Sequence, residues 1–90
     1  MSARTSAISV MGRYLRFGKS VFASVEDNCA YRFAIKEAMR AVNQTDEPPL
    51  SVLERLQLKY DAWAHESKHA HMYAVMAAAI DDMINILLTN

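Results

Sequence analysis

Ninety residues allow one small domain, and because 52% of them are apolar the composition excludes a disordered chain. The single cysteine excludes an internal disulfide, and no apolar stretch approaches the roughly twenty residues that cross a bilayer, so we expect no transmembrane segment. The net charge is zero, but residues 1–43 carry seven Lys and Arg against three Asp and Glu, and residues 44–90 carry three against seven. This asymmetry predicts an acidic partner for the first half of the chain.

The first predicted helix spans about residues 6–22. Apolar residues recur along it at spacings of three and four, which indicates a broad packing face, while Arg13, Arg16 and Lys19 occupy another face. No acid precedes Glu26, and the segment is rich in Arg and Ser. Such a segment is typical of a mitochondrial targeting sequence and equally of a basic first helix, and the sequence leaves both interpretations open.

The second predicted helix spans residues 27–43 and begins at Asp27 or Asn28, where an acid or a capping side chain suits the positive helix start. Arg32, Lys36 and Arg40 follow at steps of four and therefore form one row. The opposite side is built mostly of small residues, which lets another helix approach closely. These residues are Ala30, Phe33, Ala34, Ala38 and Ala41.

Two prolines in residues 44–49 predict a linker, and Ser51 with Glu54 forms a capping-box pattern for a third helix over residues 51–88. This helix is either one long rod or two helices jointed near residues 67–71. The chain is thus predicted to be a single all-α domain over residues 1–90, an antiparallel three-helix bundle with a long third helix.

His65, Glu66 and His69 match the H-E-x-x-H pattern, in which two histidines bind zinc and the glutamate activates water. A catalytic zinc needs a third protein ligand, and His71 points about 200° away from His69 around a helix. We therefore interpret the three residues as a polar helix surface and predict no catalytic residue and no metal site. A small zinc hydrolase is the alternative.

Two segments resemble the mitochondrial LYR-motif family, also called complex I LYR-like. Met11-Gly12-Arg13-Tyr14-Leu15-Arg16 is similar to the start of its first helix, and Ala30–Asn43 is similar to its second helix. The short acidic linker and Leu-rich third helix of that family follow here as well, so the resemblance covers about residues 7–70. Gly12 stands where the family has Tyr, whereas Arg13 is retained.

The resemblance implies a three-helix subunit of the mitochondrial matrix that binds mitochondrial acyl carrier protein. In that family the acidic recognition helix of the carrier meets basic residues, and its acylated 4'-phosphopantetheine arm passes between the helices. The matching basic positions here are Arg13, Arg16, Lys19, Arg32, Lys36 and Arg40. The residues that would line an acyl-chain channel are Met11, Ala34, Ala38 and Met39, for which tight helix packing is the other interpretation.

The predicted function is a non-catalytic accessory subunit or assembly factor within a respiratory complex, the mitoribosome or the iron–sulfur machinery. It would have no cofactor of its own, and the partner would supply the acylated 4'-phosphopantetheine. Direct nucleic-acid binding is not expected, because the chain lacks a basic excess. The alternative is a helical scaffold subunit of a multiprotein complex that binds no carrier.

Overall fold

The computed structural model describes residues 3–17 and 24–89, which form four α-helices and no strand within those ranges. The helices are α1 (Ala3–Phe17), α2 (Val25–Asn43), α3 (Pro49–Glu66) and α4 (Ala70–Thr89). The all-α prediction is confirmed, but the structure has four helices where three were predicted. The predicted end of the first helix, at Phe22, lies outside the described residues.

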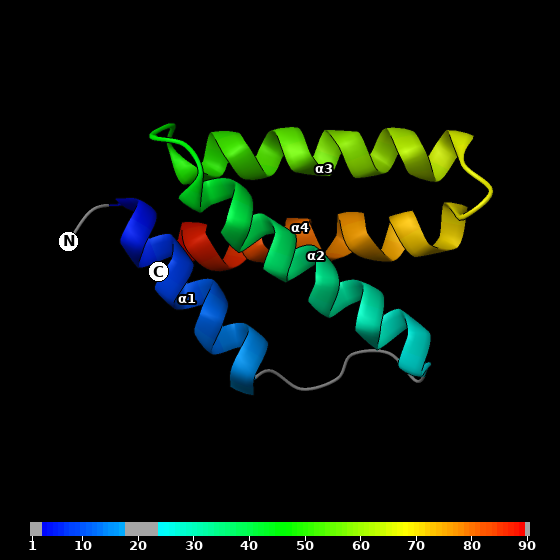
Figure 1. Ribbon diagram of the computed structural model, residues 1–90, viewed down its shortest axis with the longest axis horizontal. Coiled ribbons are helices and arrows are strands. Elements are labelled where there is room, and N and C mark those ends of the chain that lie inside the picture. The colour runs from blue at the N-terminus through cyan, green and yellow to red at the C-terminus, as the bar shows by residue number, and fades with distance from the viewer. Residues whose placement is uncertain (1–2, 18–23, 90) are drawn as a thin grey trace.

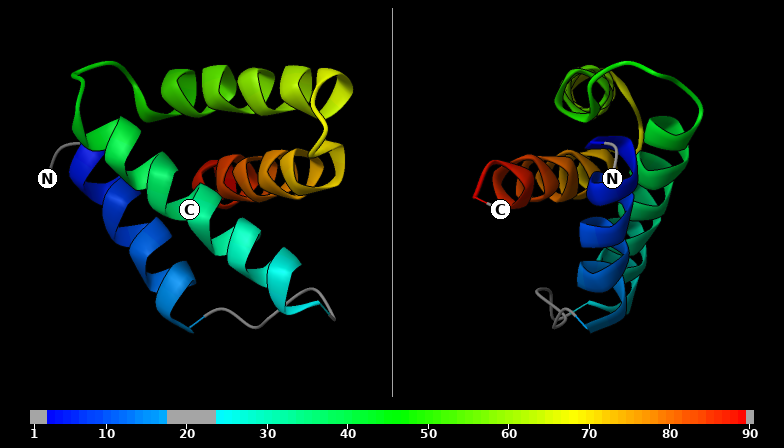
Figure 2. Two further views of the ribbon diagram at one scale, coloured as in Figure 1. Left: turned by 45° about the vertical axis from the view of Figure 1, so that its right-hand side comes forward. Right: turned by 90° about the vertical axis from the view of Figure 1, so that its left-hand side faces the viewer.

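The helices form two antiparallel hairpins, α1 with α2 and α3 with α4, as Figure 1 shows. In the right-hand view of Figure 2, α3 is seen end-on whereas α1 and α2 are seen from the side, so the hairpins cross at a large angle. Helix α4 packs against both α3 and α2 and thereby joins the two hairpins. The centre of the fold is therefore α4.

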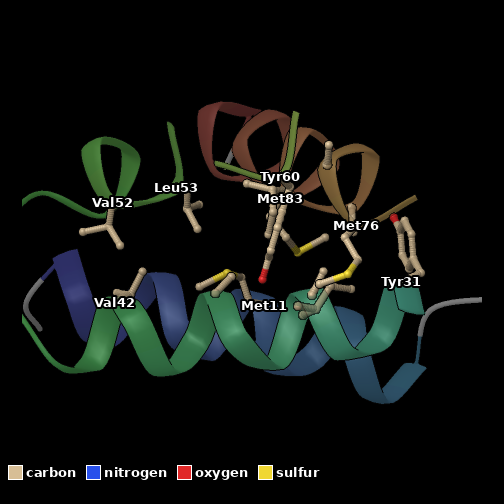
Figure 3. Close-up of a cluster of buried hydrophobic side chains, with 14 of the residues drawn as sticks. Met11, Tyr31, Val42, Val52, Leu53, Tyr60, Met76 and Met83 are labelled. Carbon is tan, nitrogen blue, oxygen red and sulfur yellow. The ribbon is translucent and has the colours of Figure 1, made fainter. Parts of the chain in front are cut away.

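The core lies between the hairpins, where side chains from all four helices point toward one another (Figure 3). The largest fully buried side chains are Met11, Ile35, Val42, Leu53, Ile80 and Met83. Full burial of such a side chain stabilises a fold by about 1.5–3 kcal/mol. The helical spacing of Met76, Ala79, Ile80 and Met83 in the sequence marked the face of α4 that the structure buries.

Helix α2 begins earlier than predicted. Its N-cap is Ser24, whose extended backbone and hydroxyl satisfy the helix start, because the Ser24 Oγ accepts a hydrogen bond from the Asp27 backbone N–H at 3.2 Å. Glu26 and Asp27 then lie in the positive first turn instead of before it. The end of α2 at Asn43 agrees with the prediction.

The predicted capping box at the start of the third helix is wrong. Helix α3 begins at Pro49, and the carbonyl oxygen of Pro48 accepts hydrogen bonds from the N–H groups of Ser51 at 3.0 Å and Val52 at 3.3 Å. Proline suits a first helical position, because its ring fixes φ and the N–H that it lacks would have no partner there. Ser51 is consequently inside the first turn, and Glu54 caps nothing.

The prediction of one long third helix is also wrong. The alternative, two helices jointed near residues 67–71, is confirmed. Ser67 ends α3 with extended backbone, and its Oγ accepts a hydrogen bond from the His69 N–H at 3.0 Å. A serine hydroxyl that takes a backbone donor competes with the helical hydrogen bonds. The chain therefore reverses at residues 67–69 without glycine or proline, and α4 returns along α3.

Helix α4 is long and apolar enough to cross a membrane by length and composition, with a third of its apolar window (33%) buried inside the fold. The core helix of a soluble protein passes the same test. Asp81 and Asp82 lie within α4, and Gln57 of α3 donates a hydrogen bond to Asp81 at 3.2 Å. The expectation that no segment spans a membrane stays a prediction.

Candidate functional site

Five of the six predicted partner-binding cations are exposed on the α1–α2 hairpin, and we call them the cationic face. Arg13 and Arg16 lie on α1, and Arg32, Lys36 and Arg40 lie on α2. The Arg32 guanidinium donates a hydrogen bond to the Leu15 carbonyl oxygen at 2.6 Å, so Arg16 and Arg32 are at the same end of the hairpin. The sixth cation, Lys19, lies outside the described residues.

The contacts of the cationic face differ from residue to residue. Arg40 forms an ion pair with Glu37 one turn earlier on α2, at 3.2 Å, and Arg32 contacts the end of α1 as described. Within the ranges that the structure describes, Arg13 and Lys36 have no ion pair. These two charges are therefore the ones best placed to receive carboxylates or phosphate from a partner.

The four residues predicted to line an acyl-chain channel belong to the packed core or its edge. Met11, Ala34 and Ala38 are fully buried, and Met39 is partly buried. The Met39 methyl group would be 3.4 Å from a Cβ atom placed at Gly12, so the end of the Met39 side chain lies against α1 at this glycine. In this conformation the small residues serve close helix packing.

The H-E-x-x-H residues do not share one helix. His65 and Glu66 lie in the last turn of α3, Ser67 ends that helix, and His69 follows in the connection to α4. All three side chains are exposed. Among the described residues, no group of three or more His, Cys, Asp and Glu side chains is placed to hold a metal ion. The zinc interpretation requires the two histidines to lie one turn apart on the same helix, and they do not, because Ser67 ends α3.

A groove that the sequence did not predict lies between α2, α3 and α4. Figure 1 shows α2 and α3 diverging from the linker that joins them, and the groove occupies the open end, over the first turns of α4. Its volume is about 1050 Å³. We call it the aromatic groove. Its apolar lining includes Val25, Ala30, Phe33, Tyr60, Trp63, Met72, Tyr73 and Met76.

Three aromatic rings form one wall of the aromatic groove. Trp63 meets Tyr73 edge-on with 5.1 Å between ring centroids, and Tyr60 lies 6.1 Å from Trp63 and 6.4 Å from Tyr73. Burial raises the pKa of the Tyr60 hydroxyl, and the negative charge of Glu37 raises it further. The groove therefore combines aromatic surface with a carboxylate on the neighbouring helix.

Charged groups surround this aromatic wall. Glu26, Asp27 and Glu37 of α2 and Lys59 of α3 line the groove. The Lys59 ammonium lies 4.7 Å from the centroid of the Trp63 ring, which is a cation–π contact. At the mouth, the His71 Nε2 of α4 lies 2.9 and 3.0 Å from the two carboxylate oxygens of Asp27, which connects the starts of α2 and α4.

The sequence indicates part of the aromatic groove. Tyr60 and Trp63 are three residues apart and share a helix face, but Tyr73 joins them only because the chain reverses after Ser67. Phe33 was placed in the packing stripe of the second helix, whereas the structure leaves it 51% exposed in the groove. Its neighbour Ala34 is fully buried.

No protein-family model matches the chain, and comparisons with curated proteins and with solved structures find no match either. Residues 3–17 and 24–89 thus form a small four-helix fold with a cationic face and an aromatic groove. Function is therefore inferred from these two surfaces and from the residues that form them.

Proposed function

We propose that the protein is a non-catalytic accessory subunit or assembly factor that binds mitochondrial acyl carrier protein through the cationic face. The observation that carries the proposal is the exposure of Arg13, Arg16, Arg32, Lys36 and Arg40 together on one helical hairpin. These are the positions at which the LYR resemblance expects the carrier to bind. Partners in a larger assembly of the mitochondrial matrix would then contact other surfaces.

The chemistry of the cationic face suits an acidic helix. Several exposed cations raise the rate of encounter with an acidic surface and fix its orientation, and this effect weakens as salt screens the charges. Arg13 supplies a planar guanidinium that can hold a carboxylate or phosphate through two hydrogen bonds, whereas Lys36 supplies a point charge. The proposal therefore requires that binding weakens steeply between low and high salt.

Insertion of the carrier's acylated arm requires a change in the packing of the helices. Met11, Ala34 and Ala38 are fully buried, so insertion of an acyl chain beside them requires the packed helices to move apart. The arm must then replace the apolar contacts that this movement breaks. We therefore propose that the carrier binds first through charge, and that its arm enters only as the helices separate.

The test is co-expression with mitochondrial acyl carrier protein, followed by purification and intact mass measurement of the complex. Recovery of a carrier with an acylated 4'-phosphopantetheine arm supports the proposal. The double variant Arg13→Glu with Lys36→Glu should abolish recovery while its circular dichroism and melting curve stay as in the wild type. Lys68→Glu is the control, because Lys68 is exposed in the connection between α3 and α4, away from the cationic face.

The buried state of Met11, Ala34 and Ala38 favours a second candidate, a helical scaffold subunit that accepts no carrier arm. This candidate predicts the same fold and the same melting behaviour but no carrier in the purified complex. Binding to its neighbours would not respond to charge reversal at Arg13 and Lys36. If the chain purifies without the carrier, or retains the carrier after the double charge reversal, carrier binding through the cationic face is wrong.

A further inference from the structure

The exposed apolar side chains of the described residues gather in the aromatic groove. Of the six large apolar side chains that are exposed, four line it: Val25, Phe33, Trp63 and Met72. Their exposed fractions run from 38% for Met72 to 77% for Val25. A concave surface that collects exposed apolar side chains from three helices is typical of a binding site.

The charges beside this apolar surface favour a positively charged ligand. Three carboxylates of α2 line the groove, those of Glu26, Asp27 and Glu37, against the single ammonium of Lys59. Asp27 also contacts His71, and Glu37 also pairs with Arg40, whereas neither partner is a lysine of the groove. The faces of tryptophan and tyrosine rings also attract cations through their quadrupole.

Lys59 and Trp63, one turn apart on α3, make such a contact in the groove. The Lys59 Nζ lies 4.7 Å from the Trp63 ring centroid, so a cation of the protein itself already covers that ring. Lysine carries its ammonium on a flexible four-carbon stem and can leave the ring for water. A ligand cation that takes its place would gain the same ring face.

We propose that the aromatic groove binds a small organic cation with an apolar body, whose quaternary ammonium group replaces the Lys59 ammonium at Trp63 while its apolar body contacts Phe33 and Met72. The volume of about 1050 Å³ is of the size of a small-molecule site, which is about 300–1,000 Å³. This site includes none of the cations of the cationic face, although its Glu37 pairs with Arg40 of that face, and its binding test requires no carrier.

The protein carries its own reporters for a binding test. Trp63 is the only tryptophan of the chain and Cys29 the only cysteine, and both line the groove. The probe is octyltrimethylammonium, compared with octanoate and octanol, which share its chain length but are anionic and neutral. Titration with each probe is followed by tryptophan fluorescence, and by the rate at which iodoacetamide alkylates Cys29, which bound probe should slow.

Two variants test whether the charge of the groove determines its affinity for the cation. Lys59→Met removes the competing cation but keeps an apolar stem, so octyltrimethylammonium should bind about 2- to 5-fold more tightly. Glu37→Gln removes one groove carboxylate and should weaken binding by a similar factor, about 2- to 5-fold. Lys68→Met makes the same charge change as Lys59→Met in the connection between α3 and α4, and should leave the affinity unchanged.

Four results would overturn the proposal. Tighter binding of octanoate, or weaker ammonium binding in Lys59→Met, would identify a site for anionic amphiphiles. Equal binding of octanol would reduce the groove to an unselective apolar surface. Absence of any fluorescence or alkylation response to millimolar probe would mean that the groove binds no small cation. Circular dichroism of each variant establishes that the fold is kept.

Discussion

The Tyr31 hydroxyl donates a hydrogen bond to the Asp82 carboxylate and so connects α2 to α4 at the edge of the core. Tyr31 is only 5% exposed, and the Tyr14 hydroxyl of α1 lies 3.2 Å from the Tyr31 hydroxyl oxygen. A phenol hydroxyl has one hydrogen, and the Tyr31 hydroxyl donates it to Asp82. Tyr14 is therefore the donor in the hydrogen bond between Tyr14 and Tyr31. One phenolic oxygen therefore connects three helices.

Tyr31→Phe keeps the ring but removes this oxygen. The variant should lower the free energy of unfolding by about 1–2 kcal/mol, because Asp82 and Tyr14 both lose their partner. Urea denaturation followed by circular dichroism measures the difference. Tyr14→Phe is the control, since it removes one neutral bond and leaves the bond to Asp82, and it should cost less than Tyr31→Phe. An equal cost would place the contribution of Tyr31 outside its bond to Asp82.

Stability should fall at alkaline pH. Burial raises the pKa of the Tyr31 hydroxyl well above its ordinary value, and the hydrogen bond to Asp82 raises it further. The unfolded chain therefore loses this proton near its ordinary pKa of about 10, whereas the folded chain retains it. The contribution of Tyr31 is complete below about pH 10 and decreases above it, by up to about 1.4 kcal/mol per pH unit.

Urea denaturation in steps between about pH 9 and 11 measures this slope. Tyr31→Phe should flatten it, since phenylalanine has no proton to lose. Tyr60 contributes in the same direction, because its pKa is also raised, so some slope should remain in the variant. An unchanged slope in Tyr31→Phe would show that other groups determine the alkaline instability.

The end of the Met39 side chain lies against Gly12 of α1, and the space at this position can be tested. An alanine Cβ would meet the Met39 methyl group at 3.4 Å, which is ordinary contact, and alanine is favoured over glycine inside a helix by about 1 kcal/mol. Gly12→Ala should therefore raise the melting temperature. Gly12→Leu would force α1 away from Met39 and should destabilise by about 1–3 kcal/mol. A stable leucine variant would mean that the hairpin is loosely packed.

Ser24 and Ser51 offer a matched pair of substitutions. Ser24→Ala removes the N-cap of α2 and should cost about 1 kcal/mol. Ser51→Ala replaces an exposed residue inside α3, where alanine has the higher helix propensity, so it should be neutral or slightly stabilising. The two melting curves decide between the observed caps and the capping box that the sequence pattern predicts.

The sequence predicted which residues form helices better than where the helices begin and end. Helical periodicity identified the buried side of α4, because a side chain such as Ile80 must recur on the face that meets the core. The break at Ser67 was not decided by periodicity. It depends on one hydroxyl that competes for the His69 N–H, and many serines lie inside helices without doing so.

Of the two candidate surfaces, the sequence predicted one and not the other. Exposure of Lys36 and its row followed from the helical repeat alone, since charged residues at steps of four share the solvent side. The aromatic groove could not be predicted, because it depends on the angle at which α2 diverges from α3. That angle brings Phe33 into the same space as Trp63, thirty residues later in the chain. Only the packing of the hairpins determines it.

The central position of α4 has a consequence for synthesis. The ribosome makes α4 after the other three helices, yet α4 supplies Ile80 and Met83, both fully buried. At a rate of about 5–20 residues per second, its twenty residues take about 1–4 s to make. During that interval Ile35 and Leu53 lack the partners on α4 that complete their burial, so the core cannot close until this helix has been made.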